Sequence, residues 1–512
     1  MPNRPVALVI IDGYGHSENR VGNAIIMAKK PNLDLLQQQY PYTFLQASGQ
    51  AVGLDWGEPG NSEVGHLSIG AGRIVKQYLS IINGAINNGS FYQNPVLLQS
   101  MHGAKNAGGK LHLLGLLTSG SVHAFFKHLL AIIEMATKTS VPEVYLHIFT
   151  DGKDSGLKEA PALLAKLRDY IKDFPQVKIA TMIGRNASME RNNDWAKTQI
   201  AYNLFVNGEG MPVTDLDQQL QEYYNQGITD EDIPPTVLAS LPRPLITPGD
   251  SLIFFNFRED SMRQITHAFM DESFDFFPRQ KPSDIHVATL TKYFDYAQEN
   301  FIIPPLQVKN NLAEWLSSNG LKQLHIAESE KYAHVTLFFN GLADRGFEGE
   351  SDFFLESPRD LVSAPEMRSA DIADKVVNEL QRGYFDFYVI NFANADLIAH
   401  LGNINLVSKG IEKVDTAIGA IHQEMQKQNG ILIITADHGN AESLTYSPTG
   451  ERETKHNSSP VPFFLVVEEH KGKKFSGQTT GIISDIAPSI LELMGITKPV
   501  EMTGRSLLSD LQ

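Results

Sequence analysis

Short apolar runs that end in a charged or hydroxyl residue recur along the whole chain, and they constrain its fold more than any other feature. These runs, rich in Val, Ile and Phe, alternate with longer stretches that carry apolar residues at three- and four-residue spacing. Such alternation is typical of α/β proteins with mainly parallel sheets. The expected strands are 6–12, 111–117, 144–150, 177–183, 251–257, 286–291, 325–328, 388–392, 431–436 and 462–467. The expected helices include 370–381, 407–428 and 484–494.

Polar residues stand directly after many of the expected strands. Asp12 ends the first run, Asp151 follows 144–150, and Asp437 follows 431–436. Arg185 and Arg258 come after two of the central runs. In open α/β sheets the carboxyl ends of the strands form the ligand crevice. We therefore expect one sheet edge lined with acidic and imidazole groups and another lined with basic groups.

Length and composition narrow the function classes. A chain of 512 residues exceeds what one core usually supports, so we expect two domains. The net charge of −16 argues against nucleic-acid binding, and the lack of an apolar run of membrane-spanning length argues against a membrane protein. No signal-peptide pattern opens the chain, so a cytoplasmic location is expected. Without cysteine, any metal must be held by oxygen and imidazole ligands. The segment 227–248, rich in Pro and acidic residues, suggests a surface excursion.

Seven residues suited to binding divalent metals occur in short motifs. They are Asp12, Ser62 in GNSEVGH, Asp396 and His400 in ADLIAH, Asp437 and His438 in TADHGN, and His456 in TKHNSSP. This set can complete two adjacent sites, and a pair of ions would clamp the attacking and leaving oxygens of a phosphoryl transfer. A metal would also activate the hydroxyl of Ser62 as nucleophile. Taken singly, Asp12 fits a strand-end turn, Ser62 a helix N-cap, and Asp396 with His400 a surface helix pair.

Longer segments resemble a known family. GNSEVGHLSIGAGR, ESEKYAHVTLFFNG, NFANADLIAHLGN and TADHGNAE closely resemble the cofactor-independent phosphoglycerate mutases of the alkaline phosphatase superfamily. The resemblance runs nearly the whole length, including SDIAPSILELMG and EMTGRSL. It implies an α/β fold in which an alkaline-phosphatase-like three-layer domain, 1–77 with 309–512, carries an inserted α/β transferase domain, 78–308.

The resemblance also implies a site. One metal would be held by Asp12, Ser62, Asp437 and His438, and the other by Asp396, His400 and His456. Two Mn²⁺ ions are expected, with Mg²⁺, Co²⁺ or Zn²⁺ as alternatives, and no 2,3-bisphosphoglycerate. Ser62 would carry the phosphoryl group while glycerate stays trapped, and Asp154 would move the proton of the glycerate hydroxyl. The implied substrate-binding residues are His123, Lys153, Asp154, Arg185, Arg191, Arg258, Ser261 and Lys331.

The chain departs from the family pattern in the implied substrate pocket. Lys153 stands where an arginine is usual, and Ser261 replaces the second arginine of FRxDR. Asn186 and Ala187 occur in place of tyrosines, and Phe125 follows Ala124 in place of a Ser-His pair. Glu190 and Asn192 stand where aspartates are common.

Three functions therefore remain open. The first is a glycolytic mutase that interconverts 3-phosphoglycerate and 2-phosphoglycerate, with Arg263, Lys153 or other neighbours compensating for the lost contacts. The second is a metal-dependent phosphohydrolase or mutase acting on another small phosphoester. The third, an inactive relative that serves as a binding protein, would have no need of all seven metal-type residues. If the protein is an enzyme of either kind, its partner is a small molecule, and a monomer suffices because one chain carries the whole site.

Overall fold

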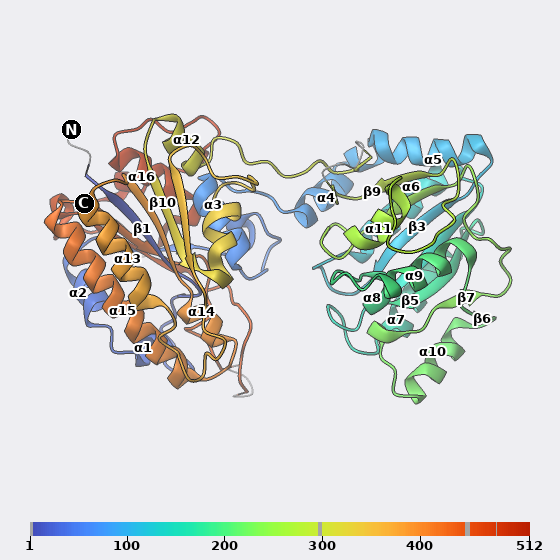
Figure 1. Ribbon diagram of the computed structural model, residues 1–512, viewed down its shortest axis with the longest axis horizontal. Helices are drawn as coiled ribbons and strands as arrows, with labels where there is room; N and C mark the ends of the chain where they lie inside the picture. Colours follow the sequence, from blue (N-terminus) through green and yellow to red (C-terminus); the bar gives the residue numbers. More distant parts are fainter. Residues whose placement is uncertain (1–3, 295–299, 446–450, 478) are drawn as a thin grey trace. The chain divides into compact units, whose positions relative to one another are not determined.

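The computed structural model describes residues 4–512 apart from 295–299, 446–450 and 478. The chain divides into two compact units (Figure 1), unit 1 with Met1–Gln77 and Leu306–Gln512, and unit 2 with Tyr78–Pro305. Each unit has its own sheet and its own main hydrophobic core. Among the described residues, no helix combines the length and the apolar character needed to cross a membrane.

The sheet of unit 1 has eight strands in the order β11-β10-β12-β1-β13-β14-β2-β15. Their bounds are β1 Val6–Ile11, β2 Tyr42–Gln46, β10 Gln323–Glu328, β11 Glu350–Leu355, β12 Phe387–Phe392, β13 Ile431–Thr435, β14 Val461–Val466 and β15 Thr479–Ile482. The strands β11, β10, β12, β1 and β13 are mutually parallel, whereas β14 runs antiparallel to both of its neighbours. Every residue of β1, β10, β12 and β13 is buried, as expected for parallel strands covered on both faces.

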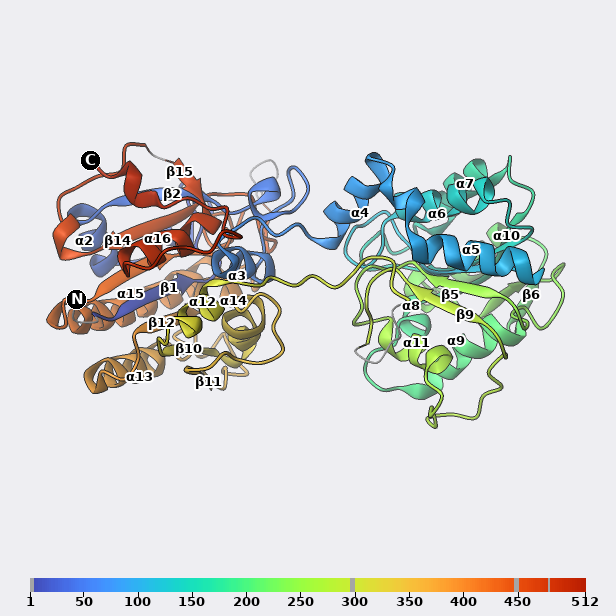
Figure 2. The ribbon, with the colours of Figure 1, turned by 90° about the horizontal axis from the view of Figure 1, so that it is seen from above.

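Helices cover both faces of this sheet. Their bounds are α1 Ala24–Met27, α2 Pro31–Gln39, α3 Ser62–Ala71, α12 Leu312–Ser318, α13 Ser369–Arg382, α14 Asn394–Ala399, α15 Ile404–Lys427 and α16 Ile486–Leu493. Gln323 donates its side-chain amide to Ala313 O in α12, and alternate strand residues face opposite sides. The next residue, Leu324, faces the layer of α13 and α15, which lie side by side (Figures 1 and 2).

Unit 2 contains a seven-stranded sheet in the order β6-β7-β5-β4-β3-β8-β9, parallel except for the β5–β7 pair. The strands are β3 Leu111–Leu117, β4 Val144–Thr150, β5 Val177–Gly184, β6 Met211–Val213, β7 Thr236–Leu238, β8 Ser251–Phe254 and β9 His286–Thr289. The helices are α4 Tyr78–Asn87, α5 Pro95–Ala107, α6 Phe126–Lys138, α7 Ala160–Ile171, α8 Arg185–Ser188, α9 Trp195–Asn207, α10 Leu216–Asn225 and α11 Arg263–Met270. Figure 2 shows α5, α6 and α7 on one side of the sheet and α9 and α11 on the other.

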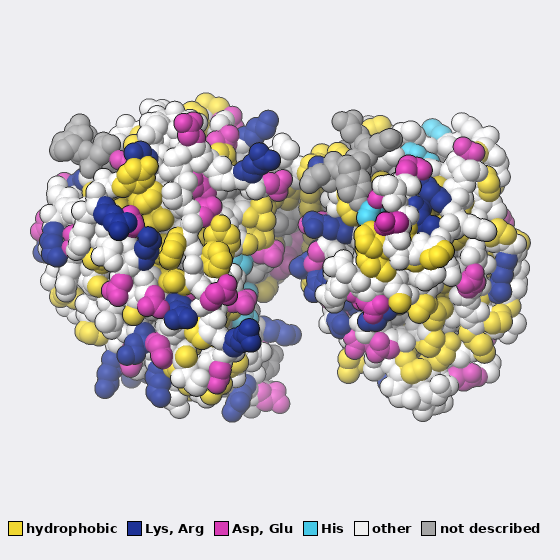
Figure 3. Space-filling model, viewed as in Figure 1, with side chains coloured by type: hydrophobic (Ala, Val, Ile, Leu, Met, Phe, Trp, Pro, Cys, Tyr) yellow, Lys and Arg dark blue, Asp and Glu magenta, His cyan; other side chains and the backbone are white. Residues whose placement is uncertain are grey.

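All ten strands expected from the sequence are present; β3 and β4 have the expected bounds, and the other eight are shifted at one or both ends. The strands expected at 251–257 and 286–291 end earlier, at Phe254 and Thr289. The expectation of a surface excursion at 227–248 is wrong in part, because β7 lies within it and Thr236 and Val237 are fully buried. On the face shown in Figure 3, Lys and Arg side chains are mixed with Asp and Glu over both units.

Candidate functional site

Four parallel strands of unit 1 deliver charged side chains to one edge of the sheet. Asp12 follows β1, and Asp437 and His438 follow β13. Lys331 ends a short turn after β10, and Asp396 lies in α14 directly after β12. Because these strands are parallel, their carboxyl ends meet at the same edge. All five residues are buried.

Ser62 is the first residue of α3, and its hydroxyl is not used to cap the helix. The N-cap is Asn61, whose side chain accepts a hydrogen bond from Val64 N at 3.0 Å. Ser62 Oγ donates to Asp12 Oδ1 at 3.0 Å and lies 3.0 Å from His438 Nε2. The helix approaches this closely because residue 65 is glycine. A Cβ there would meet the backbone oxygen of Asp437 at 2.6 Å.

Lys331 supplies the positive charge of this cluster. Its Nζ donates to Asp12 Oδ1 at 2.7 Å, to Ser62 Oγ at 2.7 Å and to Asp396 Oδ2 at 2.8 Å. Burial would lower the pKa of Lys331, but the surrounding carboxylates outweigh burial and raise it above the ordinary value. Burial would likewise raise the pKa of Asp12, and Lys331 and His438 hold it far below its usual range. The cluster is therefore ionised.

A second group lies beside the first. Nε2 of His456 and Nε2 of His400 are 3.2 Å and 3.5 Å from the same oxygen, Asp396 Oδ1. Their Nδ1 atoms lie 3.2 Å from Gly60 O and 2.8 Å from Thr454 O, contacts in which the ring N–H donates. Histidines that bind metals usually donate their other ring N–H to a carbonyl or carboxylate in this way, which leaves Nε2 free for the ion.

The donor set fits divalent ions. Asp396, His400 and His456 have ligand atoms within 4.8 Å of one another, as do Asp12, Asp396 and His438. The buried Oδ2 of Asp437 accepts no hydrogen bond from the described residues. Burial would lower the pKa of His438, but Asp437, Asp12 and Asp396 raise it to about 10. A metal must therefore displace a proton, since only neutral imidazole binds it.

Unit 2 brings together three of the residues expected to bind substrate. His123 Nδ1 lies 2.6 Å from Asp154 Oδ2, and Arg185 Nη1 donates to Asp154 Oδ1 at 3.1 Å. Arg185 also donates to Asp151 Oδ1 at 2.5 Å. Burial would raise the pKa of Asp154, but hydrogen bonds and charges from His123 and Arg185 lower it below the usual value. Asp154 is therefore a carboxylate at neutral pH.

The other expected residues of unit 2 are arranged differently. Arg191 and Arg258 share Asp260 Oδ2, at 2.6 Å and 3.3 Å. The backbone N–H of Lys153 donates to Asp151 Oδ1 at 3.2 Å, but its ammonium group turns to Glu231, at 2.9 Å, and Asn186, at 3.1 Å. Ser261 is buried, with 2% of its surface exposed, so its hydroxyl does not stand on the surface beside the arginines.

Comparison with known proteins identifies the family. The model of the Metalloenzyme superfamily matches residues 4–498. The chain is 41% identical to the 2,3-bisphosphoglycerate-independent phosphoglycerate mutase 2 of Methanosarcina acetivorans, over 99% of this chain and 97% of that protein. It is 43% identical to the 2,3-bisphosphoglycerate-independent phosphoglycerate mutase of Clostridioides difficile, over 99% of this chain and 100% of that protein. The chain belongs to the 2,3-bisphosphoglycerate-independent phosphoglycerate mutase family.

The fold agrees with this family. A crystal structure of Leishmania mexicana phosphoglycerate mutase at low cobalt concentration matches with a TM-score of 0.74 and 26% identity, covering 100% of this chain and 98% of that one. The predicted α/β, alkaline-phosphatase-like fold class is thereby confirmed. Membership of the Metalloenzyme superfamily, together with the clustered ligand groups, identifies this family member as a divalent-metal protein.

Sequence reasoning missed three buried side chains in this member of the mutase family. Asn391 Nδ2 donates to Asp12 Oδ2 at 2.8 Å and lies 3.0 Å from His66 Nε2. His66 Nδ1 lies 2.9 Å from the carbonyl oxygen of Ser62. Asn440 Nδ2 donates to Asp396 Oδ1 at 2.8 Å. His66 and Asn440 lie inside the quoted motifs GNSEVGH and TADHGN, and that position is the sequence signal that could have identified them as site residues.

Proposed function

We propose that this protein is a 2,3-bisphosphoglycerate-independent phosphoglycerate mutase of glycolysis, which interconverts 3-phosphoglycerate and 2-phosphoglycerate through phosphorylated Ser62. The observation that carries the proposal is the Ser62 hydroxyl, which contacts Asp12, Lys331 and His438 at once. The relatives at 41% and 43% identity support it. In this proposal unit 1 is the metal-binding, phosphatase-like domain and unit 2 is the substrate-binding transferase domain.

Two Mn²⁺ ions would be held by unit 1, although Mg²⁺, Co²⁺ and Zn²⁺ suit the same donors. One ion would take Asp12, Ser62, Asp437 and His438, and the other Asp396, His400 and His456. When bound, such ions lower the pKa of a ligated hydroxyl and neutralise charge on the phosphoryl oxygens.

Ser62 is the proposed nucleophile. Its Oγ, which would lose its proton on binding a metal, forms the new bond to phosphorus while the ester bond between phosphorus and the glycerate oxygen breaks. Lys331 Nζ, 2.7 Å from Oγ, holds the hydroxyl in place and adds a fixed positive charge where negative charge develops. In the second half of the cycle the other glycerate oxygen attacks the phosphoserine, and Ser62 is restored.

The two halves require a proton to move between the glycerate oxygens. Asp154 is the proposed carrier, and its lowered pKa makes it a base in the resting enzyme. It takes the proton of one hydroxyl and returns it to the oxygen that lost phosphorus. We assign substrate binding to Arg185, Arg191 and Arg258, because arginine binds carboxylate and phosphate with paired hydrogen bonds.

The remaining predicted binding residues, His123, Lys153 and Ser261, are assigned to the same substrate pocket as Asp154. His123, whose Nδ1 lies 2.6 Å from Asp154 Oδ2, would orient the Asp154 carboxylate. Lys153 and Ser261 complete the proposed pocket, although Lys153 is paired with Glu231 and Ser261 is buried. Those two observations favour, as the second candidate, a phosphohydrolase or mutase that acts on a different small phosphoester.

One assay separates the candidates. The purified protein is incubated with Mn²⁺ and 3-phosphoglycerate, and 2-phosphoglycerate and inorganic phosphate are both measured. The mutase proposal expects 2-phosphoglycerate, whereas phosphate alone would establish a hydrolase. If neither product forms, the protein has neither activity toward 3-phosphoglycerate. Ser62→Ala should abolish phosphoenzyme formation while the protein still binds metal at Asp396. The proposal includes a monomeric working unit and a cytoplasmic location, because every residue invoked belongs to one chain and the reaction belongs to glycolysis.

A further inference from the structure

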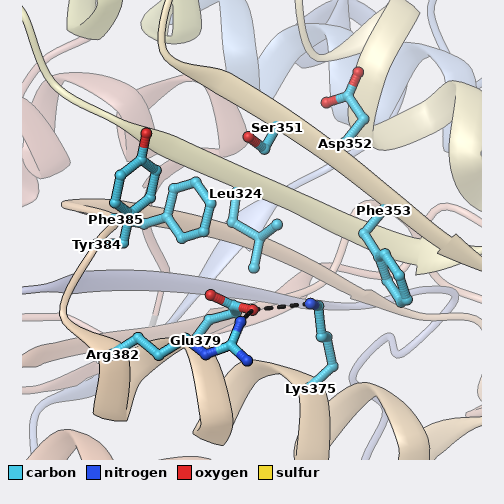
Figure 4. A pocket seen from close by; sticks show the side chains of 9 residues that line it. All are labelled: Leu324, Ser351, Asp352, Phe353, Lys375, Glu379, Arg382, Tyr384 and Phe385. Atoms are coloured by element: carbon cyan, nitrogen blue, oxygen red, sulfur yellow. Dashed lines mark hydrogen bonds and ion pairs between the residues drawn. The ribbon is translucent and has the colours of Figure 1, made fainter.

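A cavity of about 510 Å³ opens on unit 1 between β10, β11 and α13 (Figure 4). Leu324 is the second residue of β10, and Phe385 lies just before β12, so the cavity lies at the amino-terminal ends of these strands. The residues of the proposed metal centre follow the opposite, carboxyl ends. The length of β10, about 20 Å for its six residues, separates the two places.

The walls of the cavity are aromatic. Figure 4 shows Leu324 between Phe353 on one side and Tyr384 with Phe385 on the other. Tyr384 is 55% exposed, although large aromatic side chains gain most from burial. Lys322 Nζ lies 3.9 Å from the centre of the Tyr384 ring. A flat ring placed in this cavity would cover apolar surface that the protein leaves open.

Three charged lining residues, Lys375, Arg382 and Glu379, together carry one net positive charge. Lys375 Nζ and Arg382 Nη1 both donate to Glu379 Oε1 at 2.8 Å, so a single carboxylate serves two cations. Their side chains remain 32% and 69% exposed and retain donors for a further anion. Asp352 also borders the cavity, but in Figure 4 its carboxylate points away from Lys375.

The strand geometry explains the orientation of Asp352. Alternate residues of a strand face opposite sides, so Ser351 and Phe353 face the cavity and Asp352 faces the other side. There it clusters with His325 and Glu350. The negative charge of Asp352 therefore does not cancel the surplus positive charge.

A buried hydroxyl lies beside the cavity without a partner. Leu324 is paired with Ser351 on one side and with Tyr388 on the other, so the three residues form one row across β11, β10 and β12. The ring of Tyr388 packs edge-on against Phe385, with ring centres 5.9 Å apart. Among the described residues its hydroxyl has no hydrogen-bond partner, an arrangement that costs about 1–3 kcal/mol.

We propose that this cavity binds a small planar aromatic molecule that carries one negative charge. The ring lies against Phe353, Tyr384 and Phe385, and the anionic group accepts hydrogen bonds from Lys375 and Arg382. This ligand class differs from phosphoglycerate, which is aliphatic and carries several charges. The site is separate from the proposed catalytic centre and does not depend on it.

The proposal is tested with naphthalene-1-sulfonate, a planar aromatic monoanion, titrated into the full-length Mn²⁺-loaded protein by calorimetry. We expect one saturable site per chain. Arg382→Gln or Lys375→Gln should weaken binding about tenfold, because each removes a charge-assisted hydrogen bond. Ser351→Trp, which places a large ring in the cavity from an exposed strand position, should abolish it.

Two matched controls test whether the loss of affinity comes from the positive charges at the cavity. Lys413→Gln removes one exposed positive charge from α15, away from the cavity, and should leave the affinity unchanged. The affinity for 1-naphthol, a neutral ring, should be the same in the wild type and in Arg382→Gln. Mutase turnover of each variant confirms that it is folded. A dissociation constant above about 1 mM, full affinity in Ser351→Trp, or an equal loss in Lys413→Gln would overturn the proposal.

Discussion

Replacing Lys331 with methionine should destabilise the metal-free protein far more than the metal-loaded one. Lys331 Nζ is within 2.8 Å of Asp12, Ser62 and Asp396, and only 5% of its side chain is exposed. Methionine of similar length would leave two buried carboxylates without a cation. Removing one partner of a buried ion pair costs about 3–5 kcal/mol in unfolding free energy.

Divalent ions change this expectation because their charge also neutralises Asp12 and Asp396. With Mn²⁺ bound, the loss should fall to about 1.5 kcal/mol, the size of a single charge-assisted hydrogen bond. The measurement is urea unfolding followed by circular dichroism, with and without Mn²⁺, for the wild type and the variant.

Lys30→Met serves as the matched control, because Lys30 forms a partly exposed pair with Asp34 at 2.8 Å on the same unit. Its loss should stay below about 1 kcal/mol with or without metal. Equal losses for Lys331→Met in the two states, or a loss in the metal-free state no larger than that of Lys30→Met, would refute the reasoning.

Three further predictions concern pH, metal affinity and turnover. His112 and His147 are fully buried and 2.9 Å apart in unit 2, and burial lowers the pKa of both. Below about pH 6.5 these histidines bind protons in the unfolded chain but not in the folded one. The free energy of unfolding should therefore fall with pH below that point, by up to about 1.4 kcal/mol per pH unit for each histidine. Hydrogen exchange of β3 and β4 at pH 7.5 and 5.5 measures this loss, and a free energy of opening that does not change with pH would contradict it. Asn391→Leu should weaken Mn²⁺ binding about 10- to 100-fold in calorimetry, because it frees Asp12 Oδ2; unchanged affinity would exclude a positioning role. Asp154→Asn should lower kcat about 10²- to 10⁴-fold with metal content unchanged, and wild-type turnover would remove Asp154 from the chemistry.

The central strands could be predicted from the sequence because they are fully buried. Every residue of β1 is apolar, as is every residue of β13 before its last, Thr435, and that signal can be read without knowledge of the fold. Strands near the sheet edges were missed for the opposite reason. In β11 half-buried and exposed positions mix, and β7 is a three-residue strand in a proline-rich stretch.

Candidate site residues could be predicted where two signals coincided. Asp12 and Asp437 combine a ligand-type side chain with a position at the end of a buried strand. Asn391 opens the quoted segment NFANADLIAHLGN, but it lies inside the run of β12 and carries a neutral amide, so its residue type does not mark it as a partner of Asp12. The cavity beside α13 was unpredictable because it depends on how a helix packs on a sheet edge.

The position of β1 in its sheet has a consequence for how this protein is made. Its two neighbours in the sheet, β12 and β13, are encoded after the whole of unit 2. On the ribosome, the apolar segment VALVII therefore emerges early and stays without its sheet partners until most of the chain has been translated. Unit 2 is continuous and can fold as it emerges. Meanwhile this exposed apolar segment must be kept from aggregating, a task that suits a holding chaperone.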